Sequence, residues 1–549
     1  MKAQRALVLA VVGVVSFASG GWLLQRGVQQ SGSVYEKARL FEDILAHVAK
    51  YSVDSLDEVQ LYQLAIDGLI EQLDDPYANY LGPEDVADLR ERTSGTYGGL
   101  GMQIDVRDGW ITVIAPMAET PAEAAGIESG DRIVEVDGES TYGWKNEKAV
   151  IELRGEPGSE VRIKISRPGV PEPFEFNLTR ATVLIRSVQN AMMLTPEIGY
   201  LSLAYSTIGE TVVEEVKQST AELIDRGAQS VVLDLRDNPG GVLDDGVELT
   251  DLFLDPGLVV VDTRGRDAQA SRTYSTRTSQ QWPDVPFVVL VNGGTASAAE
   301  ILAGALQDHD RAIILGTPTF GKGLVQTVFP LSPTEAFQLT TGHWYTPSGR
   351  SIQRPIRRID GVLRIVGGFE EERADLSGDT TVVDSTAVFY TDSGRAVIGG
   401  GGIRPDITVR NDTLTDGERA FTMAIGSRIP LYRDVLTTYA LDVKAGNRIS
   451  QPDFAVTAAM RAELVRRLTD RGVALTDAVV AGARSLLDEQ ISYEIARYVF
   501  GRDEEMKRRV RADTQVGEAL LLLRGVATIE ELFARATERA ASQRRADAR

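Results

Sequence analysis

A serine at the junction of an apolar run and a helix-like stretch is the first residue of this sequence that suggests chemistry. Ser297 lies in VLVNGGTASAAEILAGALQDHDR, after a Gly-Gly turn and within a cluster of small residues. A strand followed by a tight turn and a helix can expose a nucleophile and offer backbone N–H groups to a developing oxyanion. No histidine lies within ten residues on either side, so this serine needs another group to activate it.

A lysine between two glycines is the best candidate for that group. Lys322 occurs in ILGTPTFGKGLVQTVFPL, with apolar stretches on both sides and Gln326 four residues later. An amine among apolar neighbours loses the hydration of its charged form, and the neutral amine can accept a proton from a serine hydroxyl. Gly321 and Gly323 permit unusual backbone angles and close approach, and the Gln326 amide could hold the amine. The alternative is a solvated loop lysine, the usual state of an isolated lysine.

A glycine-containing loop supplies a third part of the arrangement. In SVVLDLRDNPGGVLDDG an apolar strand runs into an NPGG turn. The N–H of Gly240 or Gly241 could supply one oxyanion donor, and the N–H of Ala298 could supply the other. An ordinary turn between a strand and a helix is the alternative. Arg236 and Asp237 are predicted to form an internal ion pair or a loop clamp without a chemical role.

Histidine is the usual base for a serine nucleophile, so the three histidines of the chain form a rival hypothesis. His47 lies on an N-terminal helical segment, and His309 lies a dozen residues after Ser297, past the end of the predicted helix. Neither position suggests a base. His343 lies in a predicted strand, and a Ser-His hydrolase of small esters would have to use it.

Composition excludes several classes of function. The chain has 549 residues, a formal net charge of -21 and a sequence pI of about 4.8. Proteins that bind nucleic acids concentrate positive charge, so no nucleic-acid partner is expected. The absence of cysteine excludes disulfides, thiolate catalysis and iron–sulfur clusters. We expect no metal and no cofactor.

The N-terminus indicates the compartment. After Lys2 and Arg5, residues 6–24 (ALVLAVVGVVSFASGGWLL) carry no charge. At about 1.5 Å per residue this stretch just spans a hydrocarbon core of about 30 Å. The basic residues before it predict that the rest lies in the cell envelope outside the cytoplasm, anchored to the inner membrane or exported to the periplasm. Whether the segment is cleaved stays open, and a buried soluble helix is the alternative.

The hydrophobic pattern divides the chain into regions. Strands alternating with helices after residue 181 predict an α/β core with a mixed, mostly parallel sheet. Short strands before it predict a small half-open barrel. The predicted regions are residues 1–30 (signal peptide or membrane anchor), 31–93 (helical), 94–182 (small barrel), 183–410 (α/β core) and 411–549 (helical). The last region shows no identifiable chemistry and is expected to serve packing or oligomerisation.

The motifs around the serine, the lysine and the glycine loop together resemble the carboxy-terminal processing peptidases, tail-specific serine proteases of family S41 that use a Ser-Lys dyad. The motifs appear here as NGGTASAAE, FGKGLVQ and DLRDNPGG. The resemblance covers residues 35–410 and implies a protease core of crotonase-like βαβ units. It implies that Ser297 is the nucleophile, that Lys322 is the general base and that Gln326 orients this base. The oxyanion donors would be Ala298 with Gly240 or Gly241.

Residues 94–182 similarly resemble a PDZ domain, which binds polypeptide C-termini by strand addition. Gly99 to Met102 match the loop whose N–H groups hold a terminal carboxylate, and a nest of N–H groups can bind such an anion. Leu100, Met102 and Ile104 would line the pocket for the last side chain. The residues expected to bind peptide are Gly99, Leu100, Gly101, Met102 and Ile104.

The resemblance therefore implies a serine endopeptidase of the cell envelope that captures polypeptides by their free carboxyl ends and cleaves them through an acyl-enzyme. A catalytically inactive, membrane-tethered PDZ scaffold is the alternative function. Expected partners are polypeptides with free C-termini, the membrane through the N-terminal segment, and a second copy of the chain or an adaptor protein.

Overall fold

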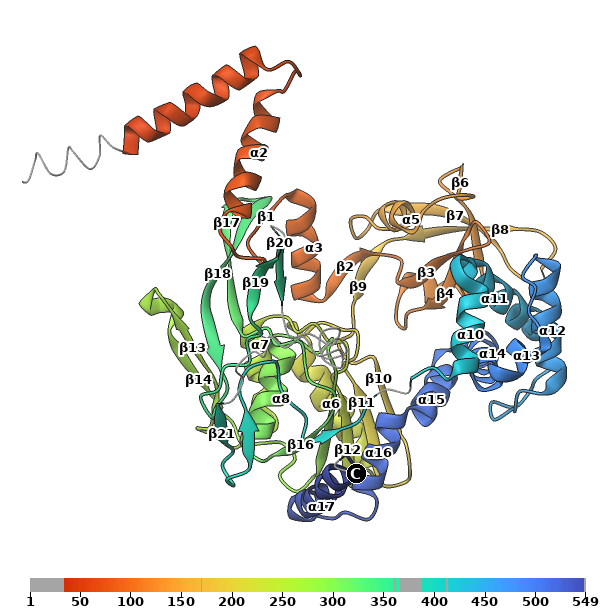
Figure 1. Ribbon diagram of the computed structural model, residues 1–549. Coiled ribbons are helices and arrows are strands. Elements are labelled where there is room, and N and C mark those ends of the chain that lie inside the picture. The colour runs from red at the N-terminus through yellow and green to blue at the C-terminus, as the bar shows by residue number, and fades with distance from the viewer. Residues whose placement is uncertain (1–33, 169, 360–361, 366–386, 411–412, 548–549) are drawn as a thin grey trace, which may run out of the picture. The chain divides into compact units, whose positions relative to one another are not determined.

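The computed structural model describes residues 34–168, 170–359, 362–365, 387–410 and 413–547 (Figure 1). The chain divides into two compact units, residues 1–82 with 327–340, and residues 83–326 with 341–549. The predicted membrane segment lies outside the described residues. No helix within the described ranges is long and apolar enough to span a bilayer.

From residue 34 onward, the first unit contains two helices and a short antiparallel ladder. Residues 34–51 are helical, and α2 (Glu58–Glu71) begins at a capping box formed by Asp57 and Gln60. β1 (Asn79–Leu81), which the sequence analysis did not predict, pairs antiparallel with the first half of β18 (Glu335–Tyr345). Asp75 accepts hydrogen bonds from the backbone N–H and the hydroxyl of Thr340, both at 3.0 Å, and so fixes the turn before β1.

The second unit begins with α3 (Pro83–Ser94) and the PDZ domain. β2 (Thr96–Gly99) and β9 (Ala181–Leu184) pair with each other. The elements between them share one hydrophobic cluster. They are β3 (Met102–Arg107), β4 (Trp110–Pro116), α4 (Pro121–Ala124), β5 (Arg132–Val136), β6 (Glu139–Ser140), α5 (Asn146–Leu153), β7 (Glu160–Ser166) and β8 (Phe174–Thr179). In the strand order β3-β4-β5-β7-β8, β3 lies at an edge.

A six-stranded sheet forms the centre of the second unit, in the order β10-β11-β12-β15-β16-β23. The strands are β10 (Asn190–Met193), β11 (Ile198–Ser202), β12 (Ser230–Asp234), β15 (Phe287–Val291), β16 (Ala312–Gly316) and β23 (Ile407–Thr408). β10 pairs antiparallel with β11, and the other neighbours pair parallel. Every residue of β11, β12, β15 and β16 is buried, as expected of parallel strands covered on both faces.

Three crossover helices cover one face of this sheet: α6 (Val212–Asp225), α7 (Leu243–Asp251) and α8 (Ala298–Asp308). The sequence pattern predicts these helices over residues 210–226, 244–252 and 298–307, so each observed bound lies within two residues of the predicted one. The remaining strands among the described residues are β13 (Val259–Gly265), β14 (Arg272–Ser275), β17 (Leu324–Ser332), β19 (Ile356–Ile359), β20 (Val362–Ile365), β21 (Val388–Tyr390) and β22 (Ala396–Ile398).

The C-terminal helices separate into two groups with different partners. α10 (Asp416–Ile425), α11 (Ile429–Ala445), α12 (Ala458–Asp470), α13 (Asp477–Gly482) and α14 (Arg484–Phe500) share a hydrophobic cluster of their own. α15 (Arg502–Ala512), α16 (Thr514–Leu523) and α17 (Ile529–Asp547) instead pack on the second face of the six-stranded sheet (Figure 1). The last helices are therefore part of the core that carries Ser297.

The first group of helices is docked on the PDZ domain. Arg433 of α11 donates a hydrogen bond of 2.9 Å to Asp105 of β3, and Lys444 donates one of 3.0 Å to Glu128. The Lys444 ammonium lowers the pKa of the Glu128 carboxyl below its ordinary value. A side chain at Gly130 would lie 2.3 Å from Leu441 of α11, so close packing needs glycine there.

A single glycine joins the two groups. Gly501 lies between α14 and α15 with φ +100°, a backbone angle that favours glycine. Across this turn, Arg497 of α14 forms two hydrogen bonds of 2.6 Å with Glu505 of α15. Burial opposes ionisation of Glu505, but the arginines beside it hold the pKa of its carboxyl below the ordinary value.

Truncation of a side chain on the sheet-facing side of α16 should therefore destabilise the core. Leu522 is buried in the cluster on the sheet, whereas its neighbour Leu521 is 60% exposed. We expect Leu522→Ala to lower the free energy of unfolding by about 2–5 kcal/mol, because it leaves a cavity. Leu521→Ala should change it by less than about 0.5 kcal/mol. Urea unfolding of both variants, followed by circular dichroism, measures the difference, and equal losses would contradict the assigned packing.

Candidate active site

Ser297 lies where β15 turns into α8, with φ 55° and ψ -120°. A positive φ is uncommon for a residue with a side chain, and it needs support from its surroundings. Thr295 gives part of this support. Its hydroxyl donates to the Leu235 carbonyl at 2.8 Å and accepts from the Asn292 N–H at 3.0 Å. The turn before Ser297 is thus tied to the end of the neighbouring strand β12.

The NPGG loop lies directly against Ser297. A Cβ on Gly240, which has φ +85°, would lie 2.5 Å from the Ala296 carbonyl oxygen and 2.9 Å from the Ser297 Cβ. The Ala296 N–H donates to the Asn238 carbonyl at 2.9 Å. The Asn238 side chain donates to the Leu203 carbonyl at 2.7 Å, so this buried amide holds the loop, the serine turn and the end of β11 together.

The two glycines of the loop differ in their N–H groups. The N–H of Gly240 donates to the Asn238 Oδ1 at 2.9 Å. Within the described residues, the N–H groups of Gly241 and Ala298 have no acceptor. A Cβ on Gly241 would lie 1.9 Å from the Ile208 carbonyl oxygen, so this position also needs glycine.

A buried carboxylate connects the serine turn to the lysine loop. Glu300, on the first turn of α8, is fully buried. Its Oε2 accepts from the N–H groups of Ser297 and Lys322, both at 2.9 Å. The two backbone nitrogens therefore lie no more than twice that distance apart. Its Oε1 accepts from the Gly321 N–H at 2.7 Å and the Thr319 hydroxyl at 2.5 Å.

Burial raises the pKa of Glu300 above its ordinary value, and the four donors around the carboxylate oppose this rise. Glu300 is not among the site residues predicted from the sequence. The signal was present, because Ser297 and Glu300 have the S-x-x-E spacing of a capping box at a helix N-terminus.

Lys322 and Gln326 are joined as their spacing suggests. The half-buried Lys322 ammonium donates to the Gln326 Oε1 at 2.9 Å. The Lys322 backbone is held on its other side, where its carbonyl accepts from the Trp344 indole N–H at 3.0 Å. Gly321 has φ +85°, and a Cβ on Gly323 would lie 3.0 Å from the Gln353 nitrogen.

The histidines lie in positions that do not favour a base for Ser297. His309 caps the far end of α8, about 18 Å along the helix from Ser297 at 1.5 Å per residue. Its ring nitrogens contact the Asp392 carboxylate and the Val259 carbonyl, each at 2.7 Å. His343 is exposed on β18, where it pairs with Arg264, and His47 is exposed.

Arg236 acts as a clamp, but its partners differ from the one predicted. Its guanidinium binds Asp234 at 2.6 Å and Asp513 at 2.7 Å, rather than Asp237. The Asp237 N–H instead donates to the Asn292 side chain at 2.9 Å. Burial disfavours the charge on Arg236, but Asp234 and Asp513 raise its pKa above the ordinary value. The clamp joins the strand before the NPGG loop to the N-cap of α16.

In the described part of the chain, the PDZ loop that is expected to bind a terminal carboxylate has backbone N–H groups without an acceptor. Gly101 has φ +74°, and its carbonyl accepts from the Met117 N–H at 2.9 Å and the Thr120 hydroxyl at 3.0 Å. Among the described residues, the N–H groups of Leu100 and Gly101 have no acceptor. Gly99 pairs with Ala181 of β9.

The expected peptide pocket has a hydrophobic wall. Leu100 is buried, and Met102 and Ile104 pack partly buried on the same cluster. Ala149 and Leu153 of α5 belong to this cluster too. In the part of the chain that the structure describes, no group of three or more histidine, aspartate or glutamate side chains could hold a metal ion.

Comparison with known proteins defines the class. The family model described as "Peptidase family S41" matches residues 197–362, and the one described as "PDZ domain" matches residues 89–166. The chain is 38% identical over 323 residues to a carboxy-terminal-processing protease of Bartonella bacilliformis, a match that covers 58% of this chain and 74% of the relative. It is 35% identical over 295 residues to a carboxyl-terminal-processing protease of Synechocystis sp., covering 53% and 68%.

A solved photosystem II D1 C-terminal processing protease has 34% sequence identity and a TM-score of 0.33, covering 56% of this chain and 83% of that one. The matched regions define a peptidase of family S41 with a PDZ domain. The chain belongs to the carboxy-terminal processing proteases, which are serine peptidases.

Removing the charge from the Glu300 carboxylate should lower the catalytic activity strongly and the stability of the fold only moderately. In Glu300→Gln, an amide NH2 group must face backbone N–H donors, so the loops that carry Ser297 and Lys322 shift. We expect kcat for an unfolded protein substrate to fall by about 10²-fold or more, with a loss of about 1–3 kcal/mol in stability. Thr319→Val, which removes one donor, should have a smaller effect. The rate at which a serine-directed phosphonate labels Ser297 checks the positioning, and an unchanged rate in Glu300→Gln would exclude it.

Proposed function

We propose that this chain captures polypeptides by their free carboxyl ends in its PDZ domain and cleaves them through an acyl-enzyme, with Ser297 as nucleophile and Lys322 as general base. The observation that carries this proposal is the Glu300 carboxylate, which binds the backbone of both residues. A polypeptide substrate is supported by the open N–H groups of the Gly99 to Met102 loop at the start of the edge strand β3.

We infer the following proton transfers for such a pair of residues. Neutral Lys322 accepts the proton of the Ser297 hydroxyl as its oxygen attacks the scissile carbonyl, and then returns the proton to the leaving amine. Gln326 holds the Lys322 amine on one side. Water, deprotonated by Lys322, then hydrolyses the acyl-enzyme.

The N–H groups of Ala298 and Gly241 are the proposed oxyanion donors. Sequence alone left Gly240 and Gly241 equivalent. We favour Gly241, because the Gly240 N–H already donates to the Asn238 side chain.

We also propose the following division of the chain: residues 1–30 as signal peptide or anchor, 31–93 as N-terminal helical region, 94–182 as PDZ domain, 183–410 as protease core and 411–549 as C-terminal helical region. Parallel pairing of β11, β12, β15 and β16 with crossover helices supports crotonase-like βαβ units in the core. The cluster that joins α15, α16 and α17 to the sheet links the last region to this core.

Residues 6–24 support export, so we propose that the protease acts in the envelope outside the cytoplasm, anchored to the inner membrane or released to the periplasm. A fusion of residues 1–33 to a reporter that is active only after export tests this. Exposed apolar side chains on residues 34–51 and α2, such as Phe41, Ile44 and Leu64, support a homo-oligomer or a complex with an adaptor. A monomeric mass in light scattering, with and without such an adaptor, would exclude both.

The decisive test compares Ser297→Ala, Lys322→Ala and His343→Ala on an unfolded protein with a free apolar C-terminus. We expect the first two variants to lose at least about 10⁴-fold in kcat and to keep their circular dichroism spectra. His343→Ala should stay active, whereas a Ser-His hydrolase would show the reverse pattern. A wild type that neither cleaves nor reacts with a serine-directed phosphonate would favour the inactive PDZ scaffold.

A further inference from the structure

A cavity of about 780 Å³ lies between the PDZ strand β3, the carboxyl ends of the core strands and the helices α14 and α15. Its size is that of a ligand-binding pocket. Ser202, Asp234 and Asn292, at or just after the ends of β11, β12 and β15, line its floor. Ligands of open α/β sheets bind outside this edge, and the loops to Gly241 and Ser297 begin at the same edge.

The lining is rich in arginine, although the whole chain has a net charge of -21. Its basic residues are all arginines, and its acidic residues are fewer. The arginines are Arg107, Arg236, Arg433, Arg497, Arg502 and Arg509, and the carboxylates are Asp105, Asp234, Asp237, Glu505 and Asp513.

The PDZ side of the cavity has two arginines for one carboxylate. Asp105 binds Arg107 at 2.5 Å and Arg433 at 2.9 Å. Arg107 is only 6% exposed, and its Nε is buried without a hydrogen-bond partner among the described residues. Asp105 and the Val106 carbonyl thus satisfy only part of this guanidinium.

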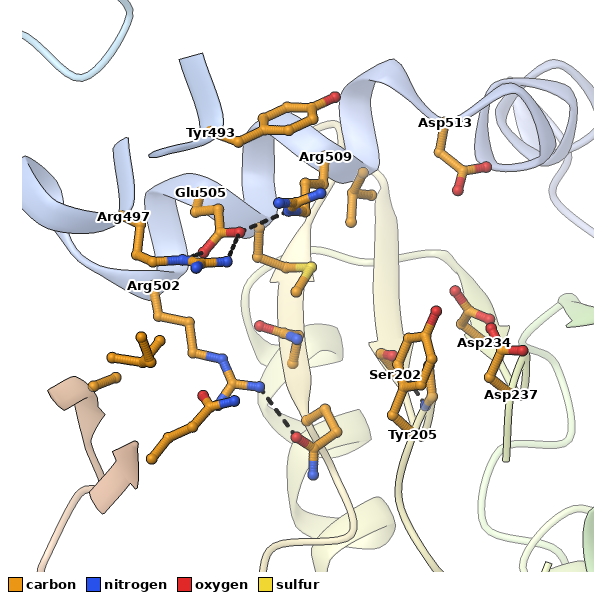
Figure 2. Close-up of a pocket in the computed structure, with 18 of the residues that line it drawn as sticks. Ser202, Tyr205, Asp234, Asp237, Tyr493, Arg497, Arg502, Glu505, Arg509 and Asp513 are labelled. Atoms are coloured by element: carbon orange, nitrogen blue, oxygen red, sulfur yellow. Dashed lines mark hydrogen bonds and ion pairs between the residues drawn. The ribbon is translucent and has the colours of Figure 1, made fainter. Parts of the chain in front are cut away.

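On the helical side, three arginines face two carboxylates, because Glu494 of α14 lies 3.7 Å from Arg497 in addition to the pairs of Glu505. Glu505 binds both Arg497 and Arg509, at 2.6 and 2.7 Å. Arg502 has a neutral partner, the Gln189 side chain, at 3.2 Å. Figure 2 shows Arg497, Arg502 and Arg509 on this side of the cavity.

The floor at the sheet edge is negative. Asp234 and Asp513 share Arg236, and Asp237 lies beside Tyr205, across the cavity from Arg502 (Figure 2). The cavity thus has an excess of arginine next to the PDZ domain and an excess of carboxylate next to the loops that lead to Ser297.

The direction of strand β3 indicates where a captured peptide would run relative to this cavity. A carboxylate held by the loop of Gly99 to Met102 fixes the end of the peptide at the start of β3. A peptide that pairs with β3 can only extend toward Arg107. At about 3.3 Å per residue, it leaves the strand about four or five residues before its end. The next residues then enter the cavity lined by Arg107, Arg433 and Arg502.

We propose that this cavity binds an acidic stretch of the polypeptide substrate, about four to eight residues before its free carboxyl end. The inference rests on the proposed function and adds a specificity to it. Glutamate and aspartate side chains of the substrate pair with the arginines on β3, α11, α14 and α15, and the chain continues along the carboxyl edge of the sheet toward Ser297.

The test uses full-length Ser297→Ala protein and fluorescent peptides of about twelve residues. The peptides share the same three apolar C-terminal residues and differ only between about the fourth and eighth residues from the end, which are acidic, amide-containing or lysine. Anisotropy gives the Kd of each. We expect the acidic peptide to bind on the order of tenfold more tightly than the amide peptide, with a smaller difference at high salt. Equal Kd values would overturn the proposal.

Charge reversal assigns the preference to the cavity. Arg502→Glu should abolish the preference for acid and improve binding of the lysine peptide. Arg484→Glu is the matched control, because Arg484 is 70% exposed on α14 outside the cavity lining and the change in net charge is the same. Retention of the acid preference in Arg502→Glu, or its loss in Arg484→Glu, would contradict the cavity as the site.

Two further measurements separate the possible failures. Inorganic phosphate, compared with chloride at equal ionic strength, should not remove the preference, and its removal would assign the cavity to a small anion instead. Cleavage of the amide peptide by the wild type tests the proposed function by itself. If cleavage fails while the Ser297→Ala protein still prefers the acidic peptide, the protease proposal is wrong and the cavity assignment stands.

Discussion

One buried carboxylate holds the candidate active site together. Glu300 is fully buried and accepts hydrogen bonds from two segments that are far apart in topology, the start of α8 and the loop before β17. An ionised carboxylate in the interior is stable only when donors surround it. The four donors are the backbone N–H groups of Ser297, Gly321 and Lys322 and the hydroxyl of Thr319. Each loop is therefore positioned by the same charge, and neither can move without leaving that charge unpaired.

Around this charge, the loops are fixed by hydrogen bonds that replace regular secondary structure. Thr295 and Asn238 tie the serine turn and the NPGG loop to the ends of β11 and β12. Ser297 can keep a positive φ because its neighbours on both sides are held. The sheet provides a rigid edge. The polar side chains fix the positions of the backbone N–H groups at that edge.

The sequence predicted the parts that depend on local signals. The crossover helices, the continuous apolar strands and the sites of close glycine approach were recognisable, because periodicity and turn residues encode them within a few positions. Lys322 and Gln326 follow from short spacing in the same way. Glu300 was missed although its capping-box spacing was visible, since a buried acid on an apolar helix is recognised only once the lysine loop is seen beside it.

Other features depend on contacts that no local pattern specifies. The apolar strands β11 to β16 indicate two covered faces, but the helices that cover the second face, α16 and α17, follow more than a hundred residues after β23 begins. The pattern of an amphipathic helix shows that one side is buried, but it does not show which element covers that side. The arginines of the cavity likewise come from β3, α11, α14, α15 and the loop after β12, so their convergence appears only in three dimensions.

Gly501 gives the C-terminal helices the properties of a lever. The long arm is α14, with 17 residues or about 25 Å at 1.5 Å per residue. A rotation of about 10° at this glycine would carry the far end of that arm by roughly 4 Å, while α15 and α16 stay on the sheet. The ion pair between Arg497 and Glu505 stabilises the angle between α14 and α15. The backbone angle at this one residue without a side chain therefore contributes to how the helices docked on the PDZ domain are placed beside the sheet edge.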